Sequence, residues 1–274
     1  MDFGLLGFAC DEGILRNNGR AGAKEGPKAF REALKKINWH TRDKPPFTDF
    51  GDVSCYSGDL EAAQKELGKR VLTTLENHQM PVIIGGGHET AYGHFLGISQ
   101  FLGHQNCGII NFDAHFDLRP LQENRLGTSG TPFLQIAHER QSKNLAFDYL
   151  VLGIQPFSNS EALFKTAHDL KVSYVLAENL EQEAAPAINK ILERHESIYL
   201  SICLDVFAES AAPGVSAPQA LGLFPGQILP LLRQIKKSNK VIALDIVELA
   251  PAYDRQDITA KLATNLLAYW LHAR

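Results

Sequence analysis

The sequence predicts an α/β protein built on a mostly parallel sheet, and three observations lead to this fold class. Short apolar runs rich in Ile, Val and Leu recur along the 274-residue chain, as expected for strands buried on both faces. Amphipathic stretches lie between these runs, and such alternation favours right-handed crossovers in a parallel sheet. The hydrophobic fraction of 45% suits a protein with a substantial core. No repeat or low-complexity linker divides the chain, so we expect a single domain over residues 1–274.

The expected strands are four to nine residues long and end at turn-forming or polar residues. In chain order they cover residues 3–9, 80–86, 107–113, 149–154, 172–177, 197–205 and 240–248. Between them, residues 10–26 and 119–131 are rich in Gly and Asn, and we expect both to be long loops. Long ordered loops in compact domains often carry function.

Four helices are expected from apolar periodicity and from one start signal. Residues 60–77 place apolar side chains on one stripe, and residues 184–195 and 258–272 show similar patterns. Another helix is expected to begin near Pro27, because proline is preorganised for a first helical turn.

Composition excludes several classes of protein. A net charge of −4 gives no basic patch for nucleic acid, and no apolar stretch reaches the roughly 18 residues of a membrane span. The start, MDFGLLGFACDEG, has no Lys or Arg ahead of its apolar run, unlike a secretory signal. The four cysteines form no CxxC pair. We therefore expect a soluble cytoplasmic protein with reduced thiols.

The ends of four expected strands carry residues of the types that bind metals. Ligands of parallel sheets bind beyond the carboxyl ends of the strands, where this chain places GGGHE (85–89), Asp113, His115, Asp117, Cys203, Asp205, Asp245 and Glu248. The period-two spacing of Asp113, His115 and Asp117 turns these side chains to one side if the backbone stays extended. The same holds for Cys203 and Asp205.

This set of side chains predicts a pair of metal ions. Clustered buried carboxylates are costly unless cations accompany them, and mixed oxygen and imidazole ligands suit Mn²⁺, Fe²⁺ or Zn²⁺. Six ligands are too many for one tetrahedral zinc: His88, Asp113, His115, Asp117, Cys203 and Asp205. Each motif alone has a plainer interpretation, such as a solvated strand end for DAHFD or a small buried thiol for Cys203. Their conjunction on separate strand ends favours the metal site.

Four motifs together resemble those of the ureohydrolase (arginase/agmatinase) family: GGGHE (85–89), DAHFD (113–117), SICLDVF (201–207) and LDIVELAP (244–251). The resemblance covers roughly residues 3–272. Within that family, three further stretches are most similar to the formimidoylglutamases: CDEGILRNNGRAGAKEGP (10–27), TSGTPFLQI (128–136) and APGVSAP (212–218). Agmatinases and arginases tend to carry a His where this chain has Ser129.

The resemblance implies a three-layer α/β/α fold around about eight mostly parallel strands, and a homo-oligomer. It implies two Mn²⁺ ions per subunit, one held by His88, Asp113 and Asp117 and the other by His115, Asp113 and Asp205, with Asp113 bridging. The implied reaction is hydrolysis of N-formimidoyl-L-glutamate to L-glutamate and formamide. Asp117 is the expected proton shuttle, and Glu248 is expected to bind the cationic amidine.

One position departs from the family pattern. Cys203 stands where the family usually has a bridging Asp, and a thiolate is a softer ligand that binds through one atom. This change is expected to weaken the second metal, to shift metal preference or to make activity redox-sensitive. We also hypothesise that Cys10 and Cys203 form a disulfide under oxidation, an idea that a Cα separation above about 7 Å would exclude.

The implied substrate carries two carboxylates, so the site should offer cations. Arg20, Arg119 and Arg125 lie in the expected rim loops, and Arg125 is favoured because it lies just before the GTSGTPF stretch. Neutral donors are expected from Asn124, Thr128 and Ser129.

Three alternatives remain open at this point. The first is a guanidino hydrolase of the agmatinase or arginase type. The second is a non-catalytic ureohydrolase relative, because Cys203 replaces the bridging Asp. A Rossmann-type nucleotide binder has only fold-level support, and no GxGxxG follows the first expected strand.

Overall fold

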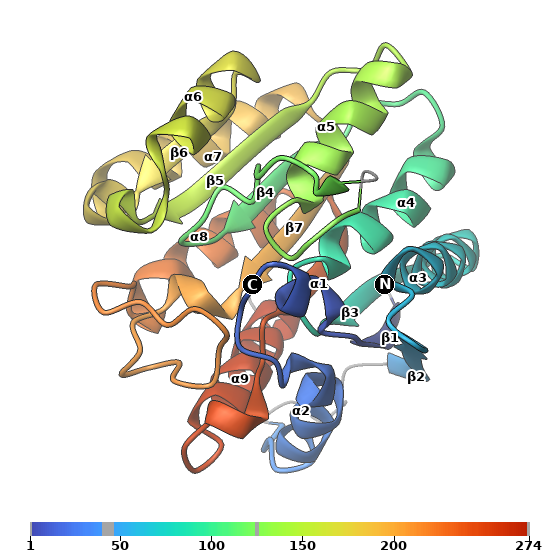
Figure 1. The fold of residues 1–274 in the computed structure, drawn as a ribbon, viewed down its shortest axis with the longest axis vertical. Coiled ribbons are helices and arrows are strands. Elements are labelled where there is room, and N and C mark those ends of the chain that lie inside the picture. The colour runs from blue at the N-terminus through green and yellow to red at the C-terminus, as the bar shows by residue number, and fades with distance from the viewer. Residues whose placement is uncertain (1, 40–46, 124–125, 273–274) are drawn as a thin grey trace.

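The computed structural model describes residues 2–39, 47–123 and 126–272. Eight strands form one sheet in the order β2-β1-β3-β8-β7-β4-β5-β6, and every neighbouring pair is parallel (Figure 1). They are β1 (Asp2–Ala9), β2 (Phe47–Ser54), β3 (Gln79–Ile84), β4 (Gly108–Phe112), β5 (Asp148–Ile154), β6 (Ser173–Leu176), β7 (Ile198–Cys203) and β8 (Val241–Val247). The fold class expected from the sequence is thus confirmed.

The seven expected strands are all present, and β2 is the strand that the sequence did not reveal. It lies at one edge of the sheet, and most of its residues are exposed. An exposed edge strand needs no apolar run, so hydrophobicity gave no signal for it. Two expected strands end two residues early: β3 stops at Ile84, before the glycine turn, and β7 stops at Cys203, where residues Leu204–Val206 form a 3₁₀ turn.

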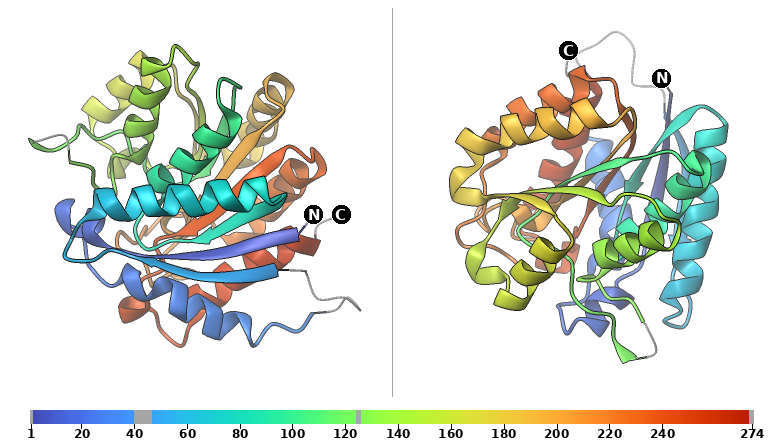
Figure 2. Two further views of the ribbon diagram at one scale, coloured as in Figure 1. Left: turned by 90° about the vertical axis from the view of Figure 1, so that its right-hand side faces the viewer. Right: turned by 90° about the horizontal axis from the view of Figure 1, so that it is seen from above.

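Helices cover both faces of the sheet and complete three layers. The helices are α1 (Glu12–Arg16), α2 (Gly26–Leu34), α3 (Leu60–Glu76), α4 (Thr90–Leu102), α5 (Pro132–Ser142), α6 (Glu161–Asp169), α7 (Leu180–Arg194), α8 (Pro225–Lys237) and α9 (Ile258–His272). One apolar core joins the sheet to α2, α7, α8 and α9, and a second joins it to α3, α4, α5 and α6. Figure 2 shows α3 on one face of the sheet, with α2 and α9 on the other.

The four expected helices exist, with small shifts in their ends. The N-terminus of α3 is capped by Asp59, whose side chain accepts from the amide of Ala62, and α2 carries Pro27 in its first turn. Helix α7 begins four residues earlier than expected, at Leu180. The expected loop over residues 10–26 was wrong in part, because it contains α1 and a 3₁₀ turn at Ala23–Glu25. No helix in the described part of the chain is both long enough and apolar enough to cross a bilayer.

Candidate metal centre

The metal-type residues lie at the carboxyl ends of the four central strands, β3, β8, β7 and β4. His88 is in the turn between β3 and α4, and Asp113 directly follows β4. Cys203 is the last residue of β7, and Glu248 directly follows β8. Four segments that are far apart in the sequence therefore meet at one place, where ligands of parallel sheets usually bind.

The glycine turn before His88 is required by a close approach of two backbones. The amide of Gly87 donates to the carbonyl oxygen of Cys10 at 3.1 Å. A Cβ on Gly86 would lie 1.7 Å from that same oxygen, so only glycine fits there. The turn thereby fixes the end of β1 against the segment that carries His88.

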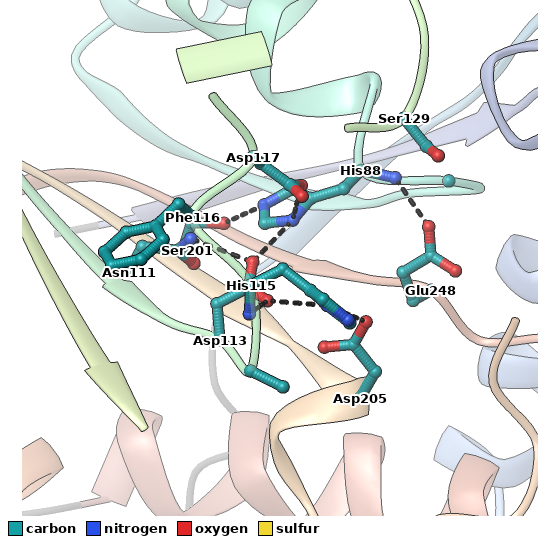
Figure 3. A network of polar contacts seen from close by, with 12 residues as sticks. His88, Asn111, Asp113, His115, Phe116, Asp117, Ser129, Ser201, Asp205 and Glu248 are labelled. Atoms are coloured by element: carbon teal, nitrogen blue, oxygen red, sulfur yellow. Dashed lines mark hydrogen bonds and ion pairs between the residues drawn. The ribbon is translucent and has the colours of Figure 1, made fainter. Parts of the chain in front are cut away.

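Two groups of potential ligands share the carboxylate of Asp113 (Figure 3). In the first group, His88 Nδ1 lies 2.9 Å from Asp113 Oδ2 and 3.0 Å from Asp117 Oδ2. The ligand atoms of His88, Asp113 and Cys203 lie within 4.8 Å of one another. In the second group, His115 Nδ1 lies 3.1 Å from Asp205 Oδ2 and 3.5 Å from Asp113 Oδ1. Asp113 is common to both groups; the first contains Cys203 where Asp117 was expected, and Asp117 lies beside His88.

The DAHFD segment reaches this arrangement by bending, so the condition of an extended backbone, on which the period-two argument depended, is not met. Residues 114–115 form a bend, and the amide of His115 donates to Asp113 Oδ1 at 2.7 Å. Asp117 has φ = 51°, in the left-handed region that Asp tolerates better than most residues. Asp205 likewise lies in the 3₁₀ turn after β7, beyond the strand itself.

The pKa values of these side chains reflect burial and mutual charge. Although burial opposes charging, contacts with Asp113 and Asp117 raise the pKa of His88 well above its usual value, and Asp205 and Asp113 do the same for His115. Burial also disfavours the ionised form of Asp113, but hydrogen bonds from the two histidines lower its pKa. Burial and the charge of Asp113 raise the pKa of Asp117 to about 6.

The donor set fits divalent cations. Asp205 Oδ1 is buried without a hydrogen-bond partner among the described residues, and such orphaned oxygens are costly in a protein interior. Burial, followed by the charges of Asp113 and Asp205, raises the pKa of the Cys203 thiol well above its usual value. A cation at this place would satisfy the carboxylate oxygens and favour the thiolate.

A small cavity of about 90 Å³ opens directly onto both ligand groups and is also lined by Glu248, Ser129, Asn17 and Arg119. Glu248 is only 3% exposed. Its Oε1 accepts from the amide of His88 at 2.9 Å, and its Oε2 accepts from the Ser216 hydroxyl. Burial and the charge of Asp205 raise the pKa of Glu248 to about 7. The backbone of Glu248 has φ = 72°, a conformation that costs a non-glycine residue about 1–2 kcal/mol.

Arg119 stands between this inner cavity and a larger outer one of about 340 Å³, and it lines both together with Asn17. Its side chain lies along Gly130: a Cβ there would be 2.7 Å from Arg119 Cδ. Among the residues that the structure describes, no carboxylate lies within ion-pair distance of its guanidinium. Arg119 therefore offers an exposed positive charge at the mouth of the cavity.

The other expected substrate residues have different surroundings. Ser129 is buried and accepts from Asn17 Nδ2 at 3.2 Å. Arg20 donates to the carbonyl oxygens of Val215 and Ser216 and lies 4.1 Å from the ring centroid of Tyr253, so it supports the loop that carries Ser216. Asn124 and Arg125 lie outside the described residues.

All four cysteines are free thiols. Cys55 packs against the apolar cluster that contains Cys10. It directly follows Ser54, the residue of β2 that pairs with Ala9. The hypothesised pairing of Cys10 with Cys203 stays a prediction.

Sequence reasoning missed six residues that line the inner cavity: Asn17, Ser158, Asn159, Leu163, Ser216 and Ala217. Asn17 and Ser216 belong to stretches that resemble the formimidoylglutamases. Their neutral side chains gave no chemical signal of their own, unlike the carboxylates and imidazoles.

Comparisons with known proteins show what this chain is similar to. The model of the arginase family matches residues 1–272. A formimidoylglutamase of Legionella pneumophila (strain Lens) is 46% identical over 268 residues, which are 96% of this chain and 83% of the relative. One of Geobacillus thermodenitrificans is 44% identical, over 94% and 80% of the two chains.

Solved structures named formiminoglutamase or formimidoylglutamase share the fold of this chain. The formiminoglutamase of Trypanosoma cruzi, solved with Mn²⁺, has a TM-score of 0.89 at 26% identity, covering 98% of this chain and 92% of that one. The formimidoylglutamase of Bacillus subtilis has a TM-score of 0.88 at 27% identity, covering 100% and 88%.

Proposed function

This chain belongs to the arginase family, and on this premise we propose that it hydrolyses N-formimidoyl-L-glutamate to L-glutamate and formamide. The observation that carries the proposal is the near full-length identity of 40–46% with relatives named formimidoylglutamase. The chemistry of the inner cavity supports it, because the cavity combines ligands for cations, a carboxylate for an amidine and a positive charge at its mouth.

We further propose that two Mn²⁺ ions bind per subunit. His88, Asp113, Asp117 and Cys203 would hold one ion, and His115, Asp113 and Asp205 the other. When bound, such ions supply Lewis acidity that lowers the pKa of water and stabilises developing negative charge.

Glu248 is the proposed partner of the amidine. The formimidoyl group is cationic when protonated, and Glu248 is a buried carboxylate on the wall of the inner cavity. A charge-assisted hydrogen bond to the amidine would orient its carbon towards the ligand groups. The amide of His88 keeps Glu248 in this position.

Asp117 is the proposed proton carrier. Water adds to the formimidoyl carbon, the bond from that carbon to the glutamate nitrogen breaks, and the leaving nitrogen takes up a proton. A pKa of about 6 lets Asp117 accept and return a proton near neutral pH. Asp117 also lines the inner cavity, within reach of a bound substrate.

The carboxylates of the substrate are proposed to bind at the mouth of the cavity. The guanidinium of Arg119 lies there and has no hydrogen-bond partner among the residues that the structure describes. Ser129 and Asn17 add neutral groups. Asn124 and Arg125 remain candidates from the sequence. Arg20 would contribute by ordering the loop of Ser216, since its donors are already occupied. We also propose that residues 1–274 form one catalytic domain that works as a homo-oligomer in the cytoplasm, where free thiols persist.

The test is product release by reduced, Mn²⁺-loaded protein. Formamide and glutamate are measured after incubation with N-formimidoyl-L-glutamate, with agmatine and arginine in parallel. We expect turnover of the formimidoyl substrate alone. Turnover of agmatine or arginine instead would identify a guanidino hydrolase, and no turnover with metal bound would favour a non-catalytic relative.

A further inference from the structure

A chain of buried polar side chains runs from the ring of His88 into the layer between the sheet and α4. His88 Nε2 lies 3.0 Å from Ser201 Oγ, and Ser201 Oγ lies 2.6 Å from Asp245 Oδ1. Ser201 and Asp245 are register partners on β7 and β8. Both are 0% exposed, and the proposed reaction uses neither of them.

Asp245 is surrounded by hydrogen-bond donors. Its Oδ2 lies 2.8 Å from His94 Nδ1 and also accepts from the hydroxyl of Tyr199. With Ser201, three donors converge on this one carboxylate, which when ionised can only accept. Burial and the charge of Asp245 raise the pKa of Tyr199 well above its usual value, so its hydroxyl keeps its proton.

This arrangement determines where the protons lie between Ser201 and His88. A serine hydroxyl has one proton, and here Asp245 holds it. Ser201 Oγ can then only accept from the ring of His88. In the neutral imidazole, which is the form that binds a metal, the single ring proton must therefore be on Nε2. The other nitrogen, Nδ1, faces Asp113 and Asp117, where the proposed cation would bind.

We propose that Asp245 and Ser201 are positioning residues that hold His88 in the Nε2–H tautomer and so present Nδ1 as a metal ligand. This inference rests on the metal centre of the proposed function. We call the hydrogen-bonded series Asp245–Ser201–His88 the relay. Without the acceptor Asp245, Ser201 is free to donate to Nε2 of His88, which favours a proton on Nδ1. That proton would bind the carboxylates of Asp113 and Asp117 and compete with the metal.

Metal affinity in the absence of substrate tests the relay. We expect Ser201→Ala to weaken Mn²⁺ binding about 10- to 100-fold, the range for groups that orient metal-ligating histidines. Asp245→Asn should weaken it to a similar degree although Ser201 is retained, because an amide is a weaker acceptor than a carboxylate. Tyr199→Phe is the matched control: it removes a buried hydroxyl bonded to Asp245 but leaves the link from Asp245 to His88 intact, and should bind Mn²⁺ like the wild type.

The tautomer itself is read by ¹⁵N NMR of the histidine rings in protein loaded with diamagnetic Zn²⁺. We expect a slowly exchanging Nε2–H signal that disappears in His88→Ala, persists in Tyr199→Phe and exchanges faster in Ser201→Ala. Urea unfolding shows that each variant is folded. If Ser201→Ala does not fold, Ser201→Cys replaces it, because a thiol of similar size is a weaker acceptor.

Wild-type affinity in Ser201→Ala or in Asp245→Asn would overturn the relay, as would equal losses in Tyr199→Phe and Ser201→Ala. A wild-type protein that binds neither Mn²⁺ nor Zn²⁺ would overturn the relay and the proposed metal centre together. A protein that binds metal through this relay but does not hydrolyse N-formimidoyl-L-glutamate would contradict the proposed substrate and leave the relay supported.

Discussion

The backbone amide of His88 donates to Glu248 Oε1 at 2.9 Å. This bond joins the turn after β3 to the residue after β8, so a candidate metal ligand and the candidate amidine-binding carboxylate are held in one unit. The second oxygen of Glu248 is held by Ser216, on the loop that Arg20 supports. The candidate metal centre and the candidate amidine-binding carboxylate therefore share a common framework in this fold.

Glu248→Gln should lower kcat/KM about 10- to 150-fold. The substitution keeps an oxygen for the His88 amide but removes the charge that faces the amidine, and a hydrogen bond to a charged group contributes about 1.5–3 kcal/mol. Mn²⁺ affinity, measured by titration, should stay near the wild-type value. Unchanged kcat/KM would mean that Glu248 does not bind the amidine.

Arg119→Ala should lower kcat/KM for N-formimidoyl-L-glutamate about 10- to 150-fold, through loss of a charge-assisted bond to a substrate carboxylate. Arg119→Lys should recover part of this loss, because it restores the charge without the planar fork. Gly130→Ala should act in the same direction, since its Cβ would displace the Arg119 side chain.

The control for Arg119 is Arg70→Ala. Arg70 lies on α3 and forms a partly exposed pair with Glu66, so the substitution removes an equal charge away from both cavities. We expect steady-state kinetics of Arg70→Ala to match the wild type. Equal kinetic losses in Arg70→Ala and Arg119→Ala would point to a general effect of charge.

Cys203→Asp should remove a thiolate ligand and restore the carboxylate that is usual in the family. In protein loaded with Co²⁺, the wild type should show a thiolate-to-metal charge-transfer band in the near ultraviolet, and the variant should lack it. We also expect the variant to bind more tightly the Mn²⁺ ion that His88 and Asp113 would hold, because a carboxylate is the harder ligand. A wild-type spectrum without the band would show that Cys203 is not a ligand.

Glu89→Gln should change how stability depends on pH. Glu89 is fully buried, its Oε1 accepts from the Gly13 amide at 2.9 Å, and its Oε2 has no partner among the described residues. Burial and the charge of Glu248 raise its pKa from 4.5 to about 8. The folded state thus holds a proton that the unfolded chain releases, so this group destabilises the fold progressively as pH rises from about 4.5 to 8.

The measurement is urea unfolding of metal-free protein at pH 5 and pH 8. Gln carries no titrating proton, so the free energy of unfolding should fall less between these pH values in Glu89→Gln than in the wild type. His88, His115, Asp117 and Glu248 are present in both proteins, so the difference between the two falls reports the charge of Glu89 together with its interaction with Glu248. Equal falls in the two proteins would place the titration on other groups.

The sequence predicted the fold because its strands are buried on both faces and therefore apolar. It missed β2 because that strand lies exposed at an edge of the sheet. It also predicted that His88, Asp113, His115 and Asp205 would meet, since the carboxyl ends of parallel strands share one rim.

The finer geometry of the site could not be read from spacing. Asp113, His115 and Asp117 converge through a bend and a left-handed residue, whereas the spacing suggested an extended segment. Asp245 looked like another strand-end carboxylate, but it points into the layer beneath α4, where His94 contacts it. Such contacts depend on which helix packs over which strand, and single-sequence patterns do not encode this choice.

The left-handed backbone of Glu248 has a consequence for attempts to make the protein more resistant to heat. At φ = 72° glycine is the residue with the least backbone strain, so an optimisation of backbone geometry alone would favour Gly at position 248. Such a variant would relieve the strain, but it would lose the carboxylate that faces the cavity and leave the buried amide of His88 without its acceptor. Stability designs for this protein should therefore hold position 248 fixed, because here backbone strain and turnover favour different residues.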